Sequence, residues 1–253
     1  MSATIDQSLL SLKESLIKMM QLVSTQLSDS QQCINQVDPL LADQIKQVEK
    51  VVNRFDSSIE KQCESIIALY NPVATDLRFV LASIRIGASL ERIGDLAYGI
   101  SRYVKKDIIT HSFDSNLLNE VKFKELYEIT INQIALSIEG FTNEDTEVAR
   151  KVLKNDLLAT EINKNTPFVL EKYIKSNKQS SVLNALYLFS IMNKLERVSG
   201  LCTNMAEETI YYLEAQILRH QKVKIKKDEI KSLLSENLPK ALPKKKIDKK
   251  SNK

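Results

Sequence analysis

The feature that most constrains this chain is a helical rhythm of apolar residues through most of its length. Apolar side chains recur every three or four positions from about residue 5 to residue 220, a spacing that places them on one face of a helix. Only 5 Gly and 5 Pro interrupt the 253 residues, whereas a protein built from short strands needs many more turn residues. The sequence therefore predicts an all-α fold of long helices.

Turn and capping signals divide this rhythm into six predicted helices. The first helix ends before Pro39, which opens the second. Asn71 and Pro72 are expected to be the N-cap and the first helical position of the third helix, and Gly140 is expected to close the fourth. The predicted helices lie at about residues 5–34, 39–70, 72–106, 115–139, 142–177 and 180–220.

An internal repeat becomes visible when segments about 105 to 110 residues apart are compared. Residues 90–93 (LERI) correspond to residues 195–198 (LERV), and residues 52–53 (VN) to residues 162–163 (IN). Short connections make sequential helices antiparallel, which favours bundles of three. We predict two tandem three-helix bundles at residues 1–110 and 114–220, followed by a flexible, disordered tail at residues 221–253.

The C-terminal segment differs from the rest of the chain in charge. Residues 219–253 hold 13 Lys and Arg against 4 Asp and Glu, a net charge of +9, whereas residues 1–218 hold 23 against 28. We interpret this Lys-rich tail as a solubilising end, since no aromatic residues are interleaved with its charges. Contact with anionic lipid or nucleic acid is the alternative.

Cysteine content and hydropathy indicate the compartment. Cys33, Cys63 and Cys202 are odd in number and form no Cys-x-x-Cys pair, which favours a reduced cytosol over zinc or redox chemistry. No apolar run approaches the roughly 18 to 20 residues that span a bilayer, and the N-terminus lacks the pattern of a signal peptide. We expect a cytoplasmic protein in which Cys202 is an inert buried thiol.

Two carboxylates mark the third predicted helix. Glu91 and Asp95 lie four residues apart and therefore on one face, opposite the apolar stripe. Such a pair repels unless a positive group lies between, so the spacing suits a cation bound by oxygen ligands. The alternative is a solvated polar face that Arg92 or Arg102 partly neutralises.

Two sequence motifs carry a resemblance to a known family. Residues 71–78 (NPVATDLR) and 90–95 (LERIGD) closely resemble the signatures P-V-A-x-D-L-R and L-E-R-I-G-D of the PhoU family. Residues 195–198 (LERV) with 203–208 (TNMAEE) resemble the second copy of the family's repeat. The resemblance covers about residues 5 to 217.

This resemblance implies both an architecture and a role. The family has two three-helix bundles with surface metal clusters of iron or zinc. Its implied partners are the ATPase subunit of a phosphate ABC transporter and a sensor histidine kinase, so that the protein restrains phosphate uptake and the phosphate-starvation response. It further implies a homodimer peripheral to the inner face of the membrane. No nucleic acid partner is expected.

Carried over residue by residue, the family's acidic motifs survive in the first repeat alone. Glu49, Glu91 and Asp95 stand at the expected metal-ligand positions. In the second repeat Glu196 remains, but Gly200 replaces the acid four residues later. Ala159 and Asn163 also occupy positions where the family commonly has acids. We predict one metal site per chain, in the first repeat, with an empty acidic patch as the alternative.

The remaining motif residues are interpreted as structural. Asp76 and Arg78 are expected to form an interhelical or helix-end pair, and Arg92 and Arg197 belong to the repeated motif.

Catalysis is not expected. The only two histidines, His111 and His220, lie in a linker and near the tail, and neither a Gly-rich phosphate loop nor a nucleophile elbow is present. Metal-assisted hydrolysis at the acidic site is the enzymatic alternative. A regulatory adaptor is favoured over a passive metal-binding helical scaffold or a divergent PhoU-domain protein with other partners.

Overall fold

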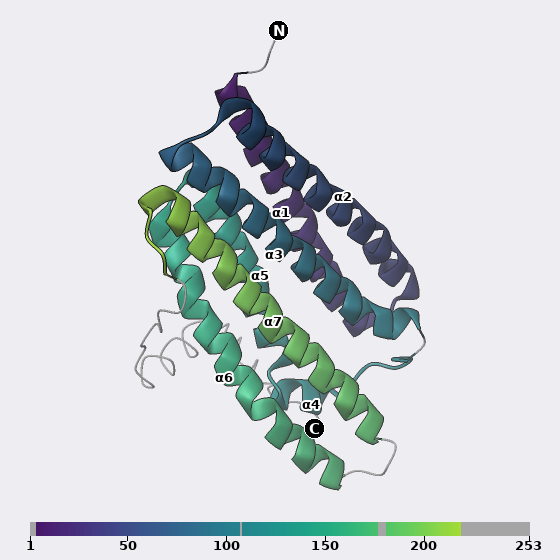
Figure 1. Ribbon diagram of the computed structural model, residues 1–253. Coiled ribbons are helices and arrows are strands. Elements are labelled where there is room, and N and C mark those ends of the chain that lie inside the picture. The colour runs from purple at the N-terminus through teal and green to yellow at the C-terminus, as the bar shows by residue number, and fades with distance from the viewer. Residues whose placement is uncertain (1–3, 107, 177–180, 219–253) are drawn as a thin grey trace, which may run out of the picture. The chain divides into compact units, whose positions relative to one another are not determined.

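A computed structural model describes residues 4–106, 108–176 and 181–218. Across these ranges the chain forms helices and no strand, which confirms the all-α prediction. Figure 1 shows how they are arranged. The first bundle comprises α1 (Ile5–Gln36), α2 (Pro39–Tyr70) and α3 (Ala74–Lys105), and the second comprises α4 (Ser115–Glu120), α5 (Phe123–Asn143), α6 (Thr146–Ser176) and α7 (Ser181–Glu214).

Local capping chemistry starts the first two helices where the sequence predicts. The Thr4 hydroxyl accepts the backbone N–H of Gln7, and the Gln7 side chain accepts that of Thr4, so α1 opens with a capping box. The Asp38 carboxylate accepts the backbone N–H groups of Leu40 and Leu41 at the start of α2. The bounds of α2 agree with the prediction.

The connection between α2 and α3 differs from the prediction. Asn71 ends α2 instead of opening α3, with a left-handed φ of 47° and a backbone N–H that donates to the Ile67 carbonyl. Pro72 lies outside both helices, and α3 begins at Ala74 without a side-chain cap from Val73. Asn can cap a helix start, but it also tolerates the left-handed conformation that ends one.

The single helix predicted at residues 115–139 is wrong, because α4 and α5 replace it. Lys122 stands between the two helices with a left-handed φ of 56°. This conformation cannot continue a right-handed helix. Nothing in the sequence around Lys122 marks the break, because neither Gly nor Pro is present there.

Gly140 serves close packing instead of ending a helix. Helix α5 continues past it and ends before Glu144, which is left-handed. A Cβ at position 140 would lie 3.1 Å from the Asp145 carbonyl and 3.1 Å from the Ala149 nitrogen, so glycine allows the start of α6 to approach α5. The Asp145 carboxylate then caps α6 by accepting the backbone N–H groups of its first turn.

Helix α7 is shorter than predicted. It ends at Glu214 rather than near residue 220, because Ala215 is left-handed at φ 57°. The predicted boundary residues Asn177, Ser180 and His220 lie outside the described residues, as does the predicted tail at 221–253.

Helices α3 and α7 are the elements through which the two bundles meet. They lie side by side, with α2 and α6 on their outer flanks and α1 and α5 behind (Figure 1). Phe79 of α3 packs against Phe141 and Tyr212 of the second bundle, with ring centroids 6.2 and 5.3 Å away. A buried hydrogen bond of 3.2 Å joins the hydroxyls of Ser30 and Tyr127, linking α1 to α5.

The three cysteines lie inside this packing. Cys33, Cys63 and Cys202 are buried, and none is paired. Burial raises the pKa of Cys33 to about 11 and that of Cys63 to about 12, with nearby acids adding to it, and it raises the pKa of Cys202 as well. These thiols are therefore protonated and unreactive near neutral pH.

Among the described helices, not one combines the length and apolar character that crossing a bilayer requires.

Candidate functional site

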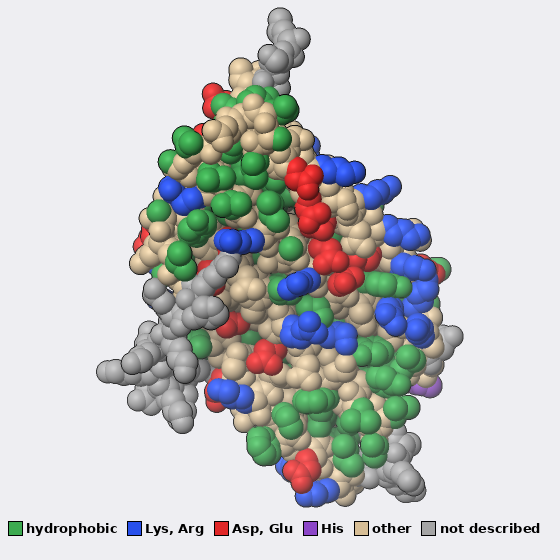
Figure 2. Space-filling view, viewed as in Figure 1, with side chains coloured by type: hydrophobic (Ala, Val, Ile, Leu, Met, Phe, Trp, Pro, Cys, Tyr) green, Lys and Arg blue, Asp and Glu red, His purple; other side chains and the backbone are tan. Residues whose placement is uncertain are grey.

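Acidic side chains line the seam where α2 packs against α3. Figure 2 shows them as a row along this seam, with Lys and Arg side chains following the outer edge of α2. We use the name acidic seam for the residues of α2 and α3 whose carboxylates influence one another. They are Glu49, Asp56 and Glu60 from α2, and Glu91 and Asp95 from α3.

The predicted ligand residues do come together within the seam, but at different depths. Glu49 is only 5% exposed, Glu91 is half-buried and Asp95 is exposed. Asp95 and Glu91 are both close enough to Glu49 to raise its pKa, and a proton on Glu49 could be shared with Asp95. The helical spacing of Glu91 and Asp95 aims both toward α2, as their i, i+4 relation predicts.

Burial makes Glu49 an unusual acid. Burial, with a smaller contribution from the carboxylates of Asp95 and Glu91, raises the pKa of Glu49 to about 7, while a hydrogen bond from Gln26 opposes the shift. The Gln26 side-chain N–H donates to Glu49 Oε2 over 3.1 Å and to the Ile45 carbonyl over 3.4 Å. Glu49 can therefore hold a proton near neutral pH and donate it to Asp95.

The pKa values of two other acids of the acidic seam are raised as well. Burial raises the pKa of Glu91, the charges of Asp95 and Asp56 add to the rise, and Arg92 works against it. Burial also raises the pKa of Asp56, with a contribution from Glu60. The seam therefore concentrates negative charge that a proton or a cation would relieve.

Gly94 lets α3 pack closely against the buried end of this seam. A Cβ there would lie 3.0 Å from Gln26 Oε1 and 3.0 Å from Glu49 Oε2. Gln26 Oε1 and Glu49 Oε1 are both buried oxygens that accept no hydrogen bond from the described residues. Buried oxygen atoms without a hydrogen-bond donor match the oxygen ligands that hard or borderline cations prefer.

The side chains as they stand do not yet form a metal-ligand set. Among residues 4–106, 108–176 and 181–218, no three His, Cys, Asp or Glu side chains are grouped to hold a metal ion. Glu49, Glu91 and Asp95 would be the residues that hold one. A bound iron or zinc would supply positive charge to the seam in place of the proton between Glu49 and Asp95.

The second repeat contains an acid that the sequence analysis missed. The Gln26 bond to the Ile45 carbonyl spans nineteen residues, and so does the buried bond from Gln133 to the Val152 carbonyl. Gln133 and Val152 therefore correspond to Gln26 and Ile45. Four residues after Ile45 stands Glu49, and four after Val152 stands Asp156, so Asp156 rather than Ala159 is the residue equivalent to Glu49. A glutamine within an otherwise apolar helix face was the signal that could have found this register.

Neutral donors satisfy the acids of the second repeat. The Ser199 hydroxyl, at the position equivalent to Gly94, donates to Asp156 over 2.8 Å. The Asn163 amide donates to Glu196 over 2.5 Å and to Asn193 over 2.8 Å. Burial raises the pKa of Asp156, while the Ser199 bond opposes the rise. Glu49 also accepts one hydrogen bond, from Gln26, but its other oxygen is buried without a donor.

The other motif residues have structural surroundings. Arg78 does not pair with Asp76 in the described part of the chain. It donates instead to the Tyr212 carbonyl over 3.3 Å and to the Thr75 hydroxyl over 3.0 Å, tying α3 to α7. Asp76 is an acid in the first turn of α3, where its negative charge interacts favourably with the helix dipole. Arg92 and Arg197 are exposed.

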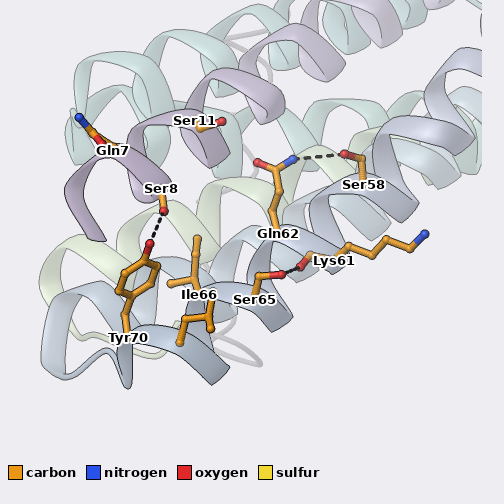
Figure 3. Close-up of a pocket in the computed structure, with 10 residues that line it drawn as sticks. Gln7, Ser8, Ser11, Ser58, Lys61, Gln62, Ser65, Ile66 and Tyr70 are labelled. Atoms are coloured by element: carbon orange, nitrogen blue, oxygen red, sulfur yellow. Dashed lines mark hydrogen bonds between the residues drawn. The ribbon is translucent and has the colours of Figure 1, made fainter. Parts of the chain in front are cut away.

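A polar groove of about 400 Å³ lies elsewhere, between the start of α1 and the end of α2 (Figure 3). Its hydroxyl and amide groups mostly bond one another. The Ser8 hydroxyl donates to Tyr70 over 3.4 Å, and the Gln62 amide donates to Ser58 over 3.3 Å. No predicted site residue lines this groove.

Fold and site together define a class of protein. It is a duplicated helical-bundle protein that presents acidic side chains from its second and third helices. Comparison with known families matches the PhoU domain twice, at residues 16–104 and 123–209. The chain belongs to the PhoU domain family.

Known relatives match most of the chain. A protein of Burkholderia sp. described as a phosphate-specific transport system accessory protein PhoU homolog is 27% identical over 220 residues, covering 87% of this chain and 93% of the relative. The PhoU protein of Escherichia coli K12, a phosphate-specific transport system accessory protein, is 29% identical over 227 residues, covering 89% and 90%. The crystal structure of PhoU from Pseudomonas aeruginosa has the same fold, with a TM-score of 0.78, 22% identity and coverage of 84% and 100%.

Proposed function

We propose that this protein is an accessory protein of a phosphate transport system and a negative regulator of phosphate uptake and of the phosphate-starvation response. The observation that carries the proposal is the double PhoU domain, together with relatives described as phosphate-specific transport system accessory proteins, which the chain matches over nearly their whole length. The protein would act by contact, without catalysis of its own. Its helical faces, rather than a catalytic cleft, would be its working parts.

The finer mechanism is an adaptor between two membrane-bound partners. One partner is the ATPase subunit of a phosphate ABC transporter, and the other is a phosphate-sensing histidine kinase. The protein would be cytoplasmic, associated with the inner face of the membrane and homodimeric. What supports this part is the family resemblance of the repeated motifs at residues 71–78 and 90–95.

Deleting the gene tests the regulatory role directly. We expect the deletion strain to express alkaline phosphatase constitutively in phosphate-rich medium, because the kinase would lose its restraint. Expression of the wild-type chain from a plasmid should restore repression. Phosphatase activity that stays repressed in the deletion strain would overturn the proposal.

Affinity capture of the tagged chain separates the adaptor from a passive scaffold. Recovery of the phosphate transporter's ATPase subunit, confirmed with the two purified proteins, supports the adaptor. If the chain binds metal but captures neither the ATPase subunit nor the kinase, the scaffold is the better description.

We also propose that Glu49, Glu91 and Asp95 bind one metal ion or cluster of iron or zinc per chain, whereas the second repeat binds none. The buried Glu49 oxygen that accepts no hydrogen bond supports a site in the first repeat, and the Ser199 hydroxyl that donates to Asp156 supports its absence in the second. Metal analysis of untagged protein should show loss of the bound ion in Asp95→Ala and no loss in Glu196→Ala. Equal metal content in wild type and Asp95→Ala would refute the site.

A further inference from the structure

A polar cluster joins α3 to α7 on the opposite side of α3 from the seam's buried core. The hydroxyls of Tyr103 and Ser190 lie 2.7 Å apart, and the Lys194 ammonium donates to Tyr103 over 3.1 Å and to Ser190 over 2.9 Å. All three side chains are half-buried. Gly99 makes room for the lysine, since a Cβ there would come within 3.3 Å of Lys194 Cε.

The internal repeat supplies a comparison for this cluster. Counting outward from the matched motifs at residues 90–93 and 195–198, Ser190 corresponds to Arg85 and Tyr103 corresponds to Glu208. Arg85 and Glu208 form an ion pair of 3.2 Å near the other end of the contact between α3 and α7. The internal repeat thus makes the two ends of the α3–α7 contact equivalent. Among the described residues, a cation is paired with a carboxylate at the Arg85 end and not at the Lys194 end.

The charge of Lys194 is not neutralised by the described residues. Its contacts there are the two hydroxyls and the face of the Tyr103 ring, 5.2 Å from the ring centroid, and it takes part in no ion pair with them. A half-buried ammonium loses hydration that neutral hydroxyls recover only in part. The Tyr103–Ser190 hydrogen bond alone would be enough to fasten α3 to α7, so the half-buried ammonium needs a further explanation.

Donor counting shows what the cluster can still bind. An ammonium group has three N–H donors and each hydroxyl has one. Two N–H groups of Lys194 already donate to the hydroxyls, and one hydroxyl proton lies in the hydrogen bond between Tyr103 and Ser190. One charged N–H and one O–H remain for an external acceptor, and the acceptor that such a pair favours is an anion.

The local potential agrees with this count. Burial acts to raise the pKa of the Tyr103 hydroxyl, but hydrogen bonds with Ser190 and Lys194 and the charges of Lys194 and Arg102 together lower it. The site therefore favours negative charge. Arg102 is exposed, and its guanidinium lies 6.0 Å from the centroid of the Tyr98 ring.

We propose that Lys194, Ser190 and Tyr103 form a binding site for a tetrahedral oxyanion of the phosphate type. The ammonium pairs with one anionic oxygen and the free hydroxyl donates to another, with Arg102 adding long-range attraction. The ligand is either free inorganic phosphate or a phosphoryl group on a lipid headgroup, because both present the same oxygens. The inference does not depend on the proposed regulatory role or on the acidic seam.

Calorimetric titration of the full chain with inorganic phosphate tests the site. We expect saturable binding by the wild type, reduced about tenfold or more in Lys194→Met and in Tyr103→Phe. Tyr103→Phe removes one hydroxyl and keeps the ring, so it guards against a variant that fails to fold. Arg85→Met should weaken the ion pair with Glu208 at the other end of the α3–α7 contact and leave phosphate affinity unchanged. Lys13→Met controls for the loss of one positive charge.

Sedimentation with vesicles distinguishes the two sources of phosphate. Vesicles of phosphatidylcholine with and without phosphatidic acid are compared for wild type and Lys194→Met. Lys194-dependent binding of phosphatidic acid vesicles in the absence of phosphate binding assigns a lipid headgroup, and Lys194-dependent binding of phosphate assigns the free anion. If neither ligand binds, or if Lys194→Met and Arg85→Met bind like the wild type, the cluster is only a fastening between helices.

Discussion

At the scale of single residues, the two repeats neutralise equivalent acids in different ways. Glu49 has one buried oxygen with no donor, whereas its counterpart Asp156 accepts the Ser199 hydroxyl. One part of the difference is that Gly94, which has no side-chain donor, stands where the second repeat has Ser199. A proton or a cation would relieve Glu49 in the first repeat, while Ser199 and Asn163 supply donors to the acids of the second.

We expect Glu49→Gln to stabilise the metal-free protein at alkaline pH. Because burial raises the Glu49 pKa from 4.5 to about 7, the folded chain holds a proton in this window that the unfolded chain has lost. The free energy of unfolding of the wild type therefore falls as pH rises from about 4.5 to about 7 and stays low above it. A neutral Gln escapes this penalty, with a gain of about 1 to 3 kcal/mol near pH 8 and none near pH 4.

Urea denaturation with a chelator present, at both pH values, measures this effect. Glu147→Gln is the matched control, since the Glu147 side chain is 85% exposed and should change stability little at either pH. An unchanged pH dependence in Glu49→Gln would show that Glu49 is ionised throughout.

At the scale of helices, backbone geometry decides where elements approach and where they end. Gly94 of α3 and Gly200 of α7 both lie in helix interiors, where glycine is unfavourable by about 1 kcal/mol relative to alanine. The first faces Gln26, Glu49 and Val52, and the second has no atom within 4 Å of where its Cβ would be. Only the first glycine has a packing reason.

Gly94→Ala and Gly200→Ala should therefore have opposite effects. The Cβ at position 94 would press on two buried polar side chains at 3.0 Å and on Val52 at 3.3 Å, which outweighs the gain in helix propensity and destabilises by about 1 kcal/mol or more. Gly200→Ala meets nothing and should stabilise by about 0.5 to 1 kcal/mol. Thermal denaturation of the two variants measures this, and a shift in the same direction for both would contradict the packing argument.

The break between α4 and α5 gives a second test. Lys122 has a left-handed φ of 56°, which disfavours any side chain with a Cβ by about 1 kcal/mol. Lys122→Gly should raise the free energy of unfolding by about that amount. Lys154→Gly, at an exposed position inside α6, should lower it by about 1 kcal/mol. Equal losses for both variants would mean that Lys122 is helical in solution.

At the scale of the whole described unit, the two repeats share one interior. The rings of Phe79, Phe141 and Tyr212 cross from α3 to α5 and α7, and the Ser30–Tyr127 bond crosses from α1 to α5. Large apolar side chains in such contacts couple the stability of the parts they join. We therefore expect the repeats to unfold together.

Phe79→Ala should destabilise both repeats equally. Phe79 is 8% exposed, so its truncation should cost about 3 to 5 kcal/mol, whereas Phe168→Ala should cost about 0.5 kcal/mol or less because Phe168 is 71% exposed. Hydrogen exchange read separately in α2 and α6 should show matching losses of protection in Phe79→Ala. Loss confined to the first repeat would show that the bundles are energetically separate.

The sequence by itself determined the helical class, the duplication, most helix bounds and the acids Glu49, Glu91 and Asp95. The class, the duplication and the bounds are written in local terms, as periodicity, capping chemistry or a repeated motif, and Glu91 and Asp95 follow from their spacing. Glu49 was predicted from the family resemblance. Where two local signals competed, as when Asn71 could end one helix or begin the next, the sequence did not decide between them.

Only the tertiary structure decided the features that depend on contacts between distant helices. The break at Lys122 has no local signal, and Gly140 is explained only by the approach of α6. Asp156 came to light once buried Gln133 aligned α6 with α2. Likewise Lys194 meets Tyr103 across 91 positions of the chain, because α3 and α7 pack together. A side chain's pKa, exposure and partners follow from which helix packs beside it, which periodicity within one helix does not specify.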